Sequence, residues 1–533
     1  MLKKIKQSFS FLKPKVSENY LEVLNKPKIS KLWIKIVLGL MIWAILEEVT
    51  LASSDLVTVF FVNDVRGGPL QSQIDILNTG LLHPRYFVGQ IMVAGLTAVS
   101  QYYLLVISIL FGVNYGIGVY TSQFFGSKQY QNLRNFVLFK IQVGLCISIF
   151  FIIIGELFPK QVLGFIINNT KNIDSKFAQQ DKKAIALSVS QGVDFLRYVV
   201  ISYPLLAINL SFITTLRETK RPFVSFFASF IAFLGSVFFL LFLVSPNQYN
   251  IYLGKFKGLY IYGAATAVIL GKVIQSILVI LFVKIKKYEF FPNRIWFKDP
   301  HYKLLSFKKM IVISLNECFW ATSLLLQVKF FSTKGIIVLT ANSLFSSILT
   351  LLIFPAYHGL SAAILVLVGN NLGSNNLKSA ELNSKRLLFL TVIIGSIIGV
   401  MLFVIGLCVP FIFPNNDPAT KILISKFLYI YAGFVLILML SGTFYSILRS
   451  GGLVWQSFLT DSFYNLFFTD LIMFCLIFFT PLDIIWVFII ARSCDLIKIL
   501  PVGILYFRKK WINNLVNKQT HQKKQVFIDY SKI

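Results

Sequence analysis

The sequence predicts an all-α membrane protein of twelve transmembrane helices in two pseudo-symmetric six-helix bundles. Of its 533 residues, 56% are hydrophobic and only 14% are charged, whereas a soluble protein carries about 25% charged residues. Apolar runs of about 20 residues recur along the chain, and each is long enough to cross a bilayer as a helix. A membrane β-barrel would show short alternating segments instead, so the pattern excludes that class.

The apolar runs define the expected spans and domain boundaries. The spans are 33–62, 87–124, 136–158, 187–215, 223–244 and 258–284 in the first half, and 308–331, 336–370, 386–413, 422–447, 455–479 and 482–507 in the second. We expect the second and eighth to bend or to extend beyond the bilayer, because they are too long for one straight crossing. The expected domains are a basic tail (1–32), a six-helix bundle (33–284), a loop (285–307), a second bundle (308–507) and a second basic tail (508–533).

Basic residues are concentrated in three regions outside these spans. The stretch up to Lys31 holds eight lysines, the loop 284–309 holds eight basic residues, and the tail from Arg508 holds seven. Twelve alternating spans put all three on one side, which the positive-inside rule makes cytoplasmic. The net charge of +29 therefore indicates topology and contact with anionic lipid, and we expect no nucleic-acid partner. We expect a plasma-membrane protein with both termini in the cytoplasm.

Short motifs recur in the two halves and predict the pseudo-symmetry. They are Leu216-Arg217 and Leu448-Arg449 at the ends of the fourth and tenth spans, Lys272/Gln275 and Arg492/Asp495 in the sixth and twelfth, and the glycine-bounded segments 116–126 and 359–373. An even number of spans per half gives both halves the same orientation, so their pseudo-axis runs along the membrane normal. Transporters commonly have this plan, with the substrate path between the halves.

Three acids lie in the first span, at Glu47, Glu48 and Asp55. Glu48 and Asp55 are seven residues apart and so share one face of a helix. Mutual repulsion prevents three acids from all being charged in a dry interior. The arrangement therefore predicts a site for a coupling proton or sodium ion. The alternative for Glu47 or Glu48 is simple contact with polar groups of the bundle.

Glu317 is the strongest single candidate, because it lies in an otherwise apolar run, 313–326. An ionisable group at membrane depth costs about 2.5–3.5 kcal/mol, so it normally faces a wet cavity or the bundle interior. The alternative is a structural acid that is hydrogen-bonded inside the bundle. Its neighbour Asn316 is a candidate to line the path, as are Gln123, Asn209 and Asn342, although packing between helices accounts for these polar residues equally well.

The remaining charged residues of the spans receive weaker assignments. Asp461 and Asp470 are nine residues apart in the eleventh span, half a helical turn out of phase, so we expect different surroundings for them. We interpret Lys272, Arg492, Asp495 and Lys498 as bundle-stabilising or snorkelling charges. We interpret Arg217 and Arg449 as interfacial anchors, because cations favour helix C-termini.

Several motifs resemble those of the MATE family, the multidrug and toxic compound extrusion transporters. The matching segments are Leu315–Trp320, Val368–Gly373, Leu448–Gly452 with Asp461 twelve residues after Arg449, Ser122–Gly126, and Phe507–Leu515. Asp55 also stands where these proteins often carry a first-span aspartate. The resemblance extends from about Ile34 to Leu515. The chain departs from the family at Val312 and Leu453, where proline and aspartate are usual, and in lacking a first-span proline.

The resemblance implies a secondary antiporter in which inward Na+ or H+ drives export of organic, cationic amphiphilic compounds. The expected ion-coupling or substrate-binding residues are Glu317, Asp55, Asp461, Glu48, Glu47 and Asn316. No Walker-type phosphate loop and no nucleophile–base pair is present, and the cysteines and histidines lack metal-site spacing. We therefore expect no enzymatic activity, no metal, and no cofactor apart from the transported ion.

Two alternatives to this function remain at the level of the sequence. A flippase for a lipid or lipid-linked saccharide shares the two-half plan, and a polar or cationic central cavity would favour it. A membrane scaffold or receptor is the second alternative, although a scaffold has little need of buried acids. For either transporter the expected partners are a small-molecule substrate and the lipid bilayer, and we expect a monomer.

Overall fold

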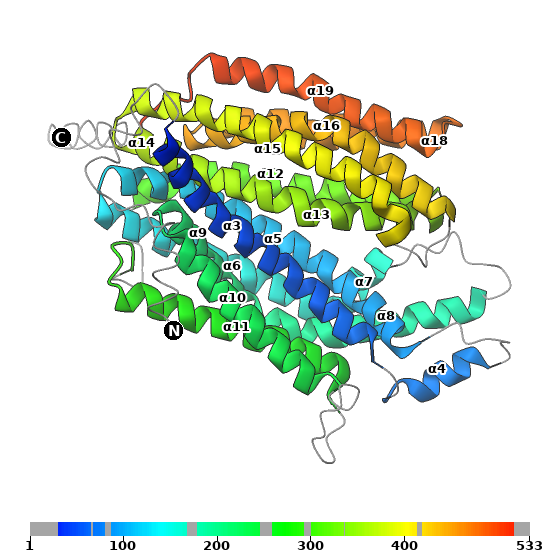
Figure 1. Ribbon diagram of the computed structural model, residues 1–533. Coiled ribbons are helices and arrows are strands. Elements are labelled where there is room, and N and C mark those ends of the chain that lie inside the picture. The colour runs from blue at the N-terminus through cyan, green and yellow to red at the C-terminus, as the bar shows by residue number, and fades with distance from the viewer. Residues whose placement is uncertain are drawn as a thin grey trace, which may run out of the picture.

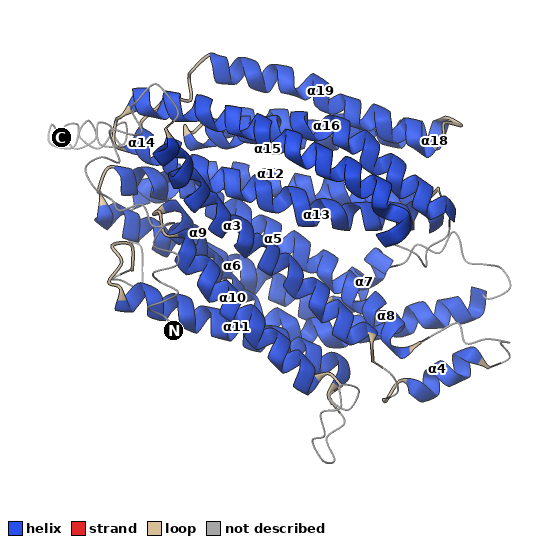
Figure 2. Cartoon of the chain, in the orientation of Figure 1, coloured by secondary structure: helices blue, strands red, loops and turns tan. Residues whose placement is uncertain are grey.

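A computed structural model of the protein describes residues 30–65, 68–79, 87–167, 178–245, 258–292, 300–334, 336–412 and 418–515. Within these ranges all regular secondary structure is helical (Figure 2). The outer parts of both predicted tails and the middle of the predicted inter-bundle loop lie outside the described residues. Where the rest of the chain is described, the all-α class predicted from the sequence is confirmed.

The helices of the first half follow the predicted order, with two short additions. They are α3 (Lys31–Asn63), α4 (Gln71–Asn78), α5 (Val88–Gly126), α6 (Tyr130–Leu157), α7 (Pro159–Ile167), α8 (Ala178–Val199), η3 (Val200–Ser202), α9 (Tyr203–Glu218), α10 (Pro222–Leu243) and α11 (Tyr260–Ile285). Ser30 caps α3, because its hydroxyl accepts a hydrogen bond from the Trp33 amide at 3.1 Å. The first span, which has no proline, is one unbroken helix of 33 residues.

The second half repeats this order. Its helices are α12 (Pro300–Ser332), α13 (Ile336–Ile364), η5 (Leu365–Gly369), α14 (Asn370–Gly373), α15 (Leu377–Ile412), α16 (Pro418–Ser450), α17 (Val454–Phe458), η6 (Leu459–Phe463), η7 (Asn465–Thr469), α18 (Asp470–Phe479) and α19 (Ile484–Phe507). Eleven helices of the described residues are long and apolar enough to cross a membrane. Counting α8 to α9 as one span, α19 is the twelfth, with 24 residues.

The fourth predicted span, 187–215, is not a single regular helix. A turn of 3-10 helix, η3, separates α8 from α9. Pro204 stands in the first turn of α9, and a proline is well tolerated there because the first helical amides have no intrahelical acceptor. The eleventh span is also irregular, since π-helical turns occupy η6 and η7. Such turns often occur at functional sites.

Equivalent helices make equivalent contacts in the two halves. In the first half α6 packs on α9, α10 on α11, and α9 on α11; in the second, α15 packs on α16, α18 on α19, and α16 on α19. Between the halves α3 packs on α13 while α5 packs on α12. These reciprocal contacts are what two bundles related by a pseudo-two-fold axis require (Figure 1).

The halves share their apolar core near one end of the molecule. We call this the terminal end, where α3 begins and α19 ends, and the opposite one the distal end (Figure 1). Residues of α3 from Trp33 to Met41 belong to the core of the second half, and Met310 and Ile313 of α12 join a core of the first half. The cluster toward the distal end contains only first-half residues among those described. The protein is therefore closed at the terminal end.

Two glycines allow the backbones to cross at the closed end. A β-carbon on Gly126 of α5 would lie 2.1 Å from the carbonyl oxygen of Asn370, and one on Gly373 would lie 2.1 Å from that of Gln123. These two contacts are reciprocal. Gly126 lies three residues after Gln123, which Gly373 contacts, and Gly373 lies three residues after Asn370, which Gly126 contacts. The two glycine-bounded segments that recur in the sequence therefore cross each other at the contact between the halves.

A short segment after α19, residues 509–515, covers this crossing. The Asn514 amide donates to the Gly373 carbonyl oxygen at 3.2 Å, and the Leu515 backbone amide donates to Gln123 Oε1 at 2.9 Å. Gln123 Nε2 in turn donates to the Ser450 carbonyl oxygen at 3.0 Å. Gln123, a predicted path-lining residue, is thus buried in the contact between the halves.

Candidate functional site

Arg217, in the last turn of α9, holds the two adjacent acids of α3. Its Nε donates to Glu47 Oε2 at 3.0 Å, and its Nη2 donates to Glu48 Oε1 at 3.0 Å. All three side chains are buried or nearly so, with exposed fractions of 5%, 0% and 12% in that order. We call these residues the Arg217 cluster. Its arginine supplies the positive charge that lets two neighbouring acids lie inside a bundle.

Hydroxyl and amide groups complete the surroundings of Glu47. Ser225 donates to Glu47 Oε2 at 2.6 Å and Ser229 donates to Oε1 at 3.0 Å, both from α10. Gln275 of α11 donates to the Ser229 hydroxyl at 3.0 Å, and Asn209 of α9 donates to Gln275 Oε1 at 3.0 Å. Glu47 is therefore held by hydrogen bonds on both oxygens. Asn209 supports Gln275 in this network but does not itself line the cavity described below.

Glu48 connects the Arg217 cluster to the second half. His358 of α13 lies 3.8 Å from Glu48 Oε1, measured from its Nδ1. The same nitrogen is 3.0 Å from the Tyr115 hydroxyl of α5. A change in the position of α13 relative to α3 would therefore alter the surroundings of Glu48.

Arg449, in the last turn of α16, holds two acids of the second half. Its Nη1 donates to Glu317 Oε1 at 3.2 Å, and its Nη2 donates to Asp461 Oδ2 at 3.3 Å. Asn316 Nδ2 adds a hydrogen bond to Glu317 Oε1 at 3.3 Å, and the Arg449 Nε donates to Ser457 Oγ at 3.1 Å. We call Arg449, Glu317 and Asp461 the Arg449 cluster. It joins α12, α16 and the π-helical turn η6 through one guanidinium group.

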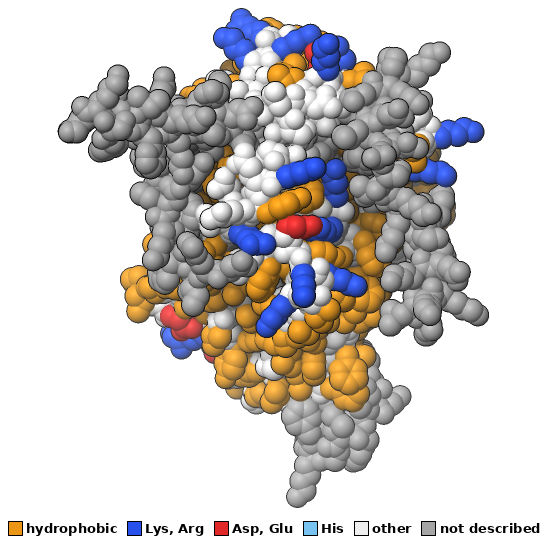
Figure 3. Space-filling model, turned by 90° about the vertical axis from the view of Figure 1, so that its left-hand side faces the viewer, with side chains coloured by type: hydrophobic (Ala, Val, Ile, Leu, Met, Phe, Trp, Pro, Cys, Tyr) orange, Lys and Arg blue, Asp and Glu red, His pale blue; other side chains and the backbone are white. Residues whose placement is uncertain are grey.

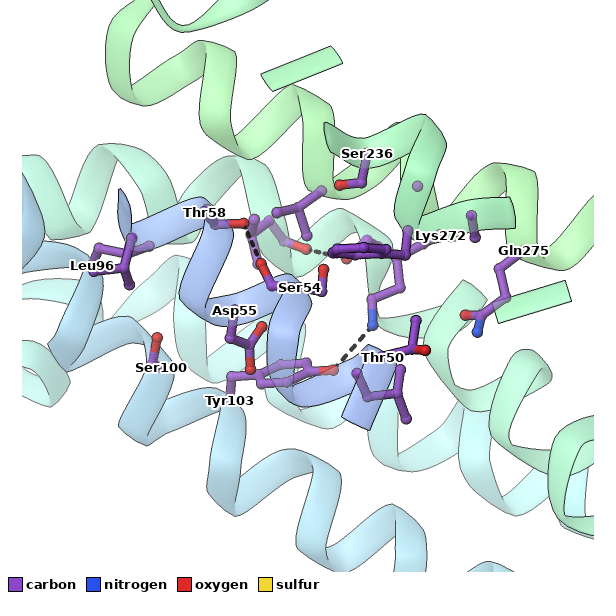
Figure 4. Close-up of a pocket in the computed structure, with 18 of the residues that line it drawn as sticks. Thr50, Ser54, Asp55, Thr58, Leu96, Ser100, Tyr103, Ser236, Lys272 and Gln275 are labelled. Carbon is purple, nitrogen blue, oxygen red and sulfur yellow. Dashed lines mark hydrogen bonds between the residues drawn. The ribbon is translucent and has the colours of Figure 1, made fainter. Parts of the chain in front are cut away.

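Asp55 lies apart from both arginine clusters, in a cavity of the first half. Its side chain is exposed to this space. Lys272 of α11 lines the same cavity and donates a hydrogen bond to the Tyr103 hydroxyl of α5 at 3.0 Å. Figure 4 shows the side chains of Asp55 and Lys272 near Tyr103, reaching it from different helices. No ion pair joins Asp55 to Lys272 or to any other part of the described chain.

The cavity combines hydroxyl groups with apolar walls. The helices α3, α5, α8, α10 and α11 and the 3-10 turn η3 form it, and its volume is about 100 Å³. The polar lining includes Thr50, Ser54, Thr58, Ser100, Ser202, Ser229, Ser236 and Gln275. Phe195, Phe233 and several valines supply apolar surface. A site with apolar walls and a few convergent polar groups is the usual form of a small-molecule site.

The remaining acids of the second half have other partners. Asp470, 2% exposed, accepts from Gln327 Nε2 at 2.9 Å. Asp495 pairs with Lys498 at 3.0 Å and with Arg492 at 3.6 Å, all on α19. Asp461 and Asp470 therefore have different surroundings, as their spacing predicts. The α19 charges pair with one another, as expected of bundle-stabilising residues.

The structure corrects the interpretation of two cations, Arg217 and Arg449. Arg217 and Arg449 are not interfacial anchors, since both are buried in ion pairs with the predicted acids. Lys272 lines the cavity that holds Asp55 and donates to the Tyr103 hydroxyl of α5, and its bundle-stabilising role stays a prediction. Sequence position identifies a cation at a helix end, but it does not show how deeply neighbouring helices bury that end.

A buried ion pair in the first half was not foreseen. Lys140 of α6 lies 2.8 Å from Glu218 of α9, and the two are 0% and 1% exposed. Thr121 of α5 also donates to Glu218. A single lysine in the apolar run of the third span is the signal that could have identified this pair, because a charge at membrane depth needs a partner. His358 is likewise absent from the predicted site.

The described residues contain no group of three or more His, Cys, Asp or Glu side chains arranged to hold a metal ion. Of the predicted acids, Glu47 and Glu48 are brought together, as are Glu317 and Asp461, each pair by an arginine. Among the described residues, Asp55 is the predicted acid that has no ion pair within 4.0 Å, and it shares its cavity with Lys272. The site therefore consists of two arginine–carboxylate clusters and one acid, Asp55, that faces a cavity.

Comparisons with known proteins agree with this architecture. The profile of the MatE family matches residues 82–242 and 313–461, together more than half of the chain. A search of curated proteins gave no match. Solved structures with the same fold include an outward-facing multidrug resistance MATE family transporter of the MOP superfamily, with a TM-score of 0.71 and 13% identity over 93% of this chain and 99% of that one.

Two further solved structures come from named organisms. A MOP superfamily transporter from Pyrococcus furiosus, described as having a binding pocket of reverse polarity, has a TM-score of 0.72 and 13% identity over 93% of this chain and 99% of that one. A Vibrio cholerae MATE transporter mutant has a TM-score of 0.69 and 13% identity over 89% and 96%. At such low identity these structures are similar to this chain in fold alone.

Proposed function

This chain belongs to the MatE family of membrane transporters, and on that premise we propose that it is a secondary antiporter. In this proposal, inward movement of Na+ or H+ drives outward movement of organic, cationic amphiphilic compounds. The chain is not an enzyme, and its membership of a transporter family argues against the scaffold or receptor alternative.

The observation that carries the proposal is that one acid of the membrane domain faces a cavity without an ion pair, whereas the other predicted acids are paired with arginine. Asp55 has no ion-pair partner among the described residues and faces a cavity, whereas Glu47, Glu48, Glu317 and Asp461 are each held by an arginine. A carboxylate that faces a cavity without a direct ion pair can take up a cation or a proton. Asp55 is therefore the proposed first site for the coupling ion or the substrate.

The arginine clusters are the proposed means of coupling ion binding to conformation. Binding of a proton or Na+ at Glu317 or Asp461 would weaken the attraction of that acid to Arg449, and so loosen the link between α12, α16 and η6. Glu48 would act similarly through Arg217 and His358. A ligand shifts a conformational equilibrium only by its difference in affinity for the two states. Here that difference would come from exchanging an ion pair for a bound cation.

The surface charge supports a cytoplasmic terminal end. Lys and Arg side chains gather on that face, where Figure 3 shows many cations and few acids. They include Lys128, Lys286, Lys287, Lys385, Arg508, Lys509 and Lys510. Under the positive-inside rule this face is cytoplasmic. We accordingly propose a monomer in the plasma membrane with both termini inside, closed toward the cytoplasm in this structure.

The flippase alternative depends on the same cavity. Lys272 is a cation on its wall, and a cation in a cavity suits the phosphate of a lipid or lipid-linked saccharide. The cavity belongs to the first half, however, and not to a central space between the halves. Gradient-independent movement of a fluorescent phospholipid across vesicle membranes would favour this alternative.

Gradient-driven transport of a fluorescent cation tests the proposed antiport. The purified protein in vesicles should move tetramethylrhodamine methyl ester when either a Na+ or an H+ gradient is imposed separately, because the coupling ion and the substrate share the acidic sites. Asp55→Asn should abolish the response, since it removes the open charge while keeping the size of the side chain. The matched control is Asp483→Asn, at the exposed N-terminal cap of α19. Gradient-independent movement, or unchanged transport by Asp55→Asn, would contradict the proposal.

A further inference from the structure

The chain reverses direction immediately after α19 and lies as a short strap over the terminal end. We call residues 509–515 the strap. Lys509, the first residue beyond the helix cap, has a φ of 55°. A left-handed residue in this position commonly ends a helix and turns the chain back. The strap therefore starts on the second half, at the end of its last helix.

One end of the strap is anchored to the second half by Trp511. This side chain is 1% exposed and belongs to the apolar core of that half. Its Nε1 donates to the carbonyl oxygen of Tyr506 at 3.0 Å, and the two rings stack with their centres 5.6 Å apart. A β-carbon on Gly451 would lie 1.9 Å from the Trp511 carbonyl oxygen, so the two backbones are in close contact. Trp511 is thus fixed to the ends of α16 and α19.

The other end of the strap docks on the first half through Leu515. Its side chain is 7% exposed and joins a core cluster that consists mainly of residues from α5, α6, α9 and α11. Its backbone amide donates to Gln123 Oε1 at 2.9 Å, while Gln123 Nε2 donates to the Ser450 carbonyl oxygen at 3.0 Å. Gln123, which is buried, therefore binds two backbone groups of the second half, and one of them belongs to the strap.

The equivalent segment of the first half stays on its own half. Lys287, which follows α11, also has a positive φ, of 49°. Phe290 is buried in the cluster that also receives Leu515. The Glu289 carbonyl oxygen accepts from Arg134 Nε at 2.7 Å, and the Glu289 carboxylate pairs with Arg221 at 2.7 Å. Both arginines belong to the first half, so this segment makes no crossing within its described residues, which end at 292.

Two pseudo-equivalent amides at the crossing show the same difference. Gln123 lies three residues before Gly126, and Asn370 lies three residues before Gly373. Asn370 is 6% exposed, and neither polar atom of its side chain has a hydrogen-bond partner among the described residues. Of these two amides, Gln123 is therefore the one that a strap occupies.

The strap limits how far the halves can separate while both of its ends stay attached. Four residue steps join Trp511 to Leu515, and they reach about 14 Å at most when fully extended. Separation of α5 from the second half must also break the hydrogen bond between Leu515 and Gln123 and withdraw the Leu515 side chain from its cluster. The loss of this apolar burial raises the free energy of the open conformer relative to the closed one.

We propose that the strap is a clamp that holds the terminal end closed, and that release of Leu515 from the first half is required for opening. Trp511 stays anchored during this step, so the strap remains with the second half. The clamp acts on the equilibrium between the closed and open conformers, whichever ion or substrate is bound. It therefore goes beyond the proposed antiport.

The test measures how often the crossing opens. Ser122 of α5 is 0% exposed, and a β-carbon on Gly369 of the second half would lie 2.7 Å from its hydroxyl oxygen. In full-length protein whose five native cysteines are replaced by alanine, Ser122→Cys supplies a thiol that the second half shields. Its rate of reaction with N-ethylmaleimide in detergent, with no gradient present, reports the open fraction when opening and closing are fast compared with labelling.

Three variants are combined with Ser122→Cys. Leu515→Asp places a charge in the apolar cluster, Leu515→Met keeps an apolar side chain, and Asn513→Asp adds the same charge two residues earlier, at a half-buried position of the strap. Leu515→Asp should increase the labelling rate at least about tenfold, the change expected from the loss of one buried leucine side chain. Leu515→Met and Asn513→Asp should label close to the parent rate.

An unchanged rate in folded Leu515→Asp protein would overturn the clamp. An equal increase in Asn513→Asp would do the same, because it would assign the effect to charge and not to the docking of Leu515. Thermal unfolding in detergent establishes that each variant is folded. If Leu515→Asp does not fold, Leu515→Gly decides the test in the same way, since it removes the side chain without adding a charge.

This outcome is separate from that of the proposed antiport. Absence of gradient-driven transport, together with faster labelling in Leu515→Asp, would refute the coupling and leave the clamp. Gradient-driven transport by a protein whose labelling rate does not respond to Leu515→Asp would support antiport and refute the clamp.

Discussion

Arg217 and Arg449 end pseudo-equivalent helices, and each holds two carboxylates, yet the acids come from different places. Both partners of Arg217 are neighbours on α3, whereas the partners of Arg449 lie on α12 and on η6. The two halves therefore share the position of the arginine but differ in the helices that carry its carboxylate partners. The Arg449 cluster therefore joins separate helices, and the loss of one contact can free them to move apart.

The two clusters also differ in burial. Glu47 is fully buried and has two serine donors besides arginine, while Glu317 and Asp461 remain 19% and 17% exposed. A more enclosed acid exchanges protons or ions with the aqueous phase less readily. This contrast suggests a mainly structural role for Glu47 and a functional one for Glu317, which the following variants examine.

The largest expected effect is on stability, from removing the arginine of the more buried cluster. Arg217→Met should cost about 3–5 kcal/mol, because it leaves uncompensated charges in the interior. Arg449→Met should cost less, since water can reach Glu317 and Asp461. Thermal unfolding in detergent, with Lys286→Met as the control, measures both losses. A larger loss for Arg449→Met would reverse the proposed difference between the clusters.

A second expected effect is on coupling, from neutralising Glu317. Glu317→Gln keeps the Oε1 acceptor for Asn316 and a neutral acceptor for Arg449, so the protein should fold. Gradient-driven dye efflux should be lost, because the side chain no longer ionises. Vesicle transport and thermal unfolding, measured on the same preparation, separate the two results.

The alanine variant at this position distinguishes a structural from a coupling role. Glu317→Ala leaves Asn316 and Arg449 without their acceptor and should cost a further 1–3 kcal/mol or so. If Glu317 is only structural, the glutamine protein should transport normally and alanine alone should be harmful. Normal ion-dependent transport by Glu317→Gln would end the coupling role.

The smallest expected effect is at Asp470. Asp470→Asn keeps the acceptor for Gln327 Nε2, and Asp470 touches neither arginine cluster in the described structure. Transport should therefore decline less than in Glu317→Gln. Efflux rates for the two proteins at equal amounts in vesicles provide the comparison. Equal and complete losses would show that this ranking of the acids is wrong.

Much of the fold follows from hydropathy, because length and apolarity alone identify a transmembrane helix. The break at Val200–Ser202 was missed, although Pro204 has no amide hydrogen to donate to the carbonyl of Val200, four residues earlier, and so disfavours a continuous α-helix there. The glycine segments correctly indicated related positions in the two halves. Their function as a crossing depends on the relative placement of α5 and α14, which no local pattern contains.

The candidate site was only partly predictable. Acids at membrane depth are conspicuous, so Glu47, Glu48, Asp55, Glu317 and Asp461 could be selected from their surroundings or from the family resemblance. Most of the pairings could not, because Arg217 is about 170 residues from Glu47 and Glu48, and Arg449 is 132 residues from Glu317. Arg449 and Asp461 are only twelve residues apart, but their contact still depends on how the two spans pack. The place of Lys272 on the cavity wall could not be predicted either, because the helical spacing to Gln275 does not show which wall of the bundle it faces.

The crossing at Gly126 and Gly373 also provides a means of selecting one conformation. A methyl group on either residue would collide with a carbonyl oxygen of the other half in this closed conformer, and we expect the collision to be relieved when the terminal end opens. Such a substitution raises the free energy of that conformer and leaves the alternative untouched, and each 1.4 kcal/mol of difference changes the population ratio about tenfold. One added carbon atom is thus enough in principle to enrich the protein in the form whose terminal end is open, ready for structure determination.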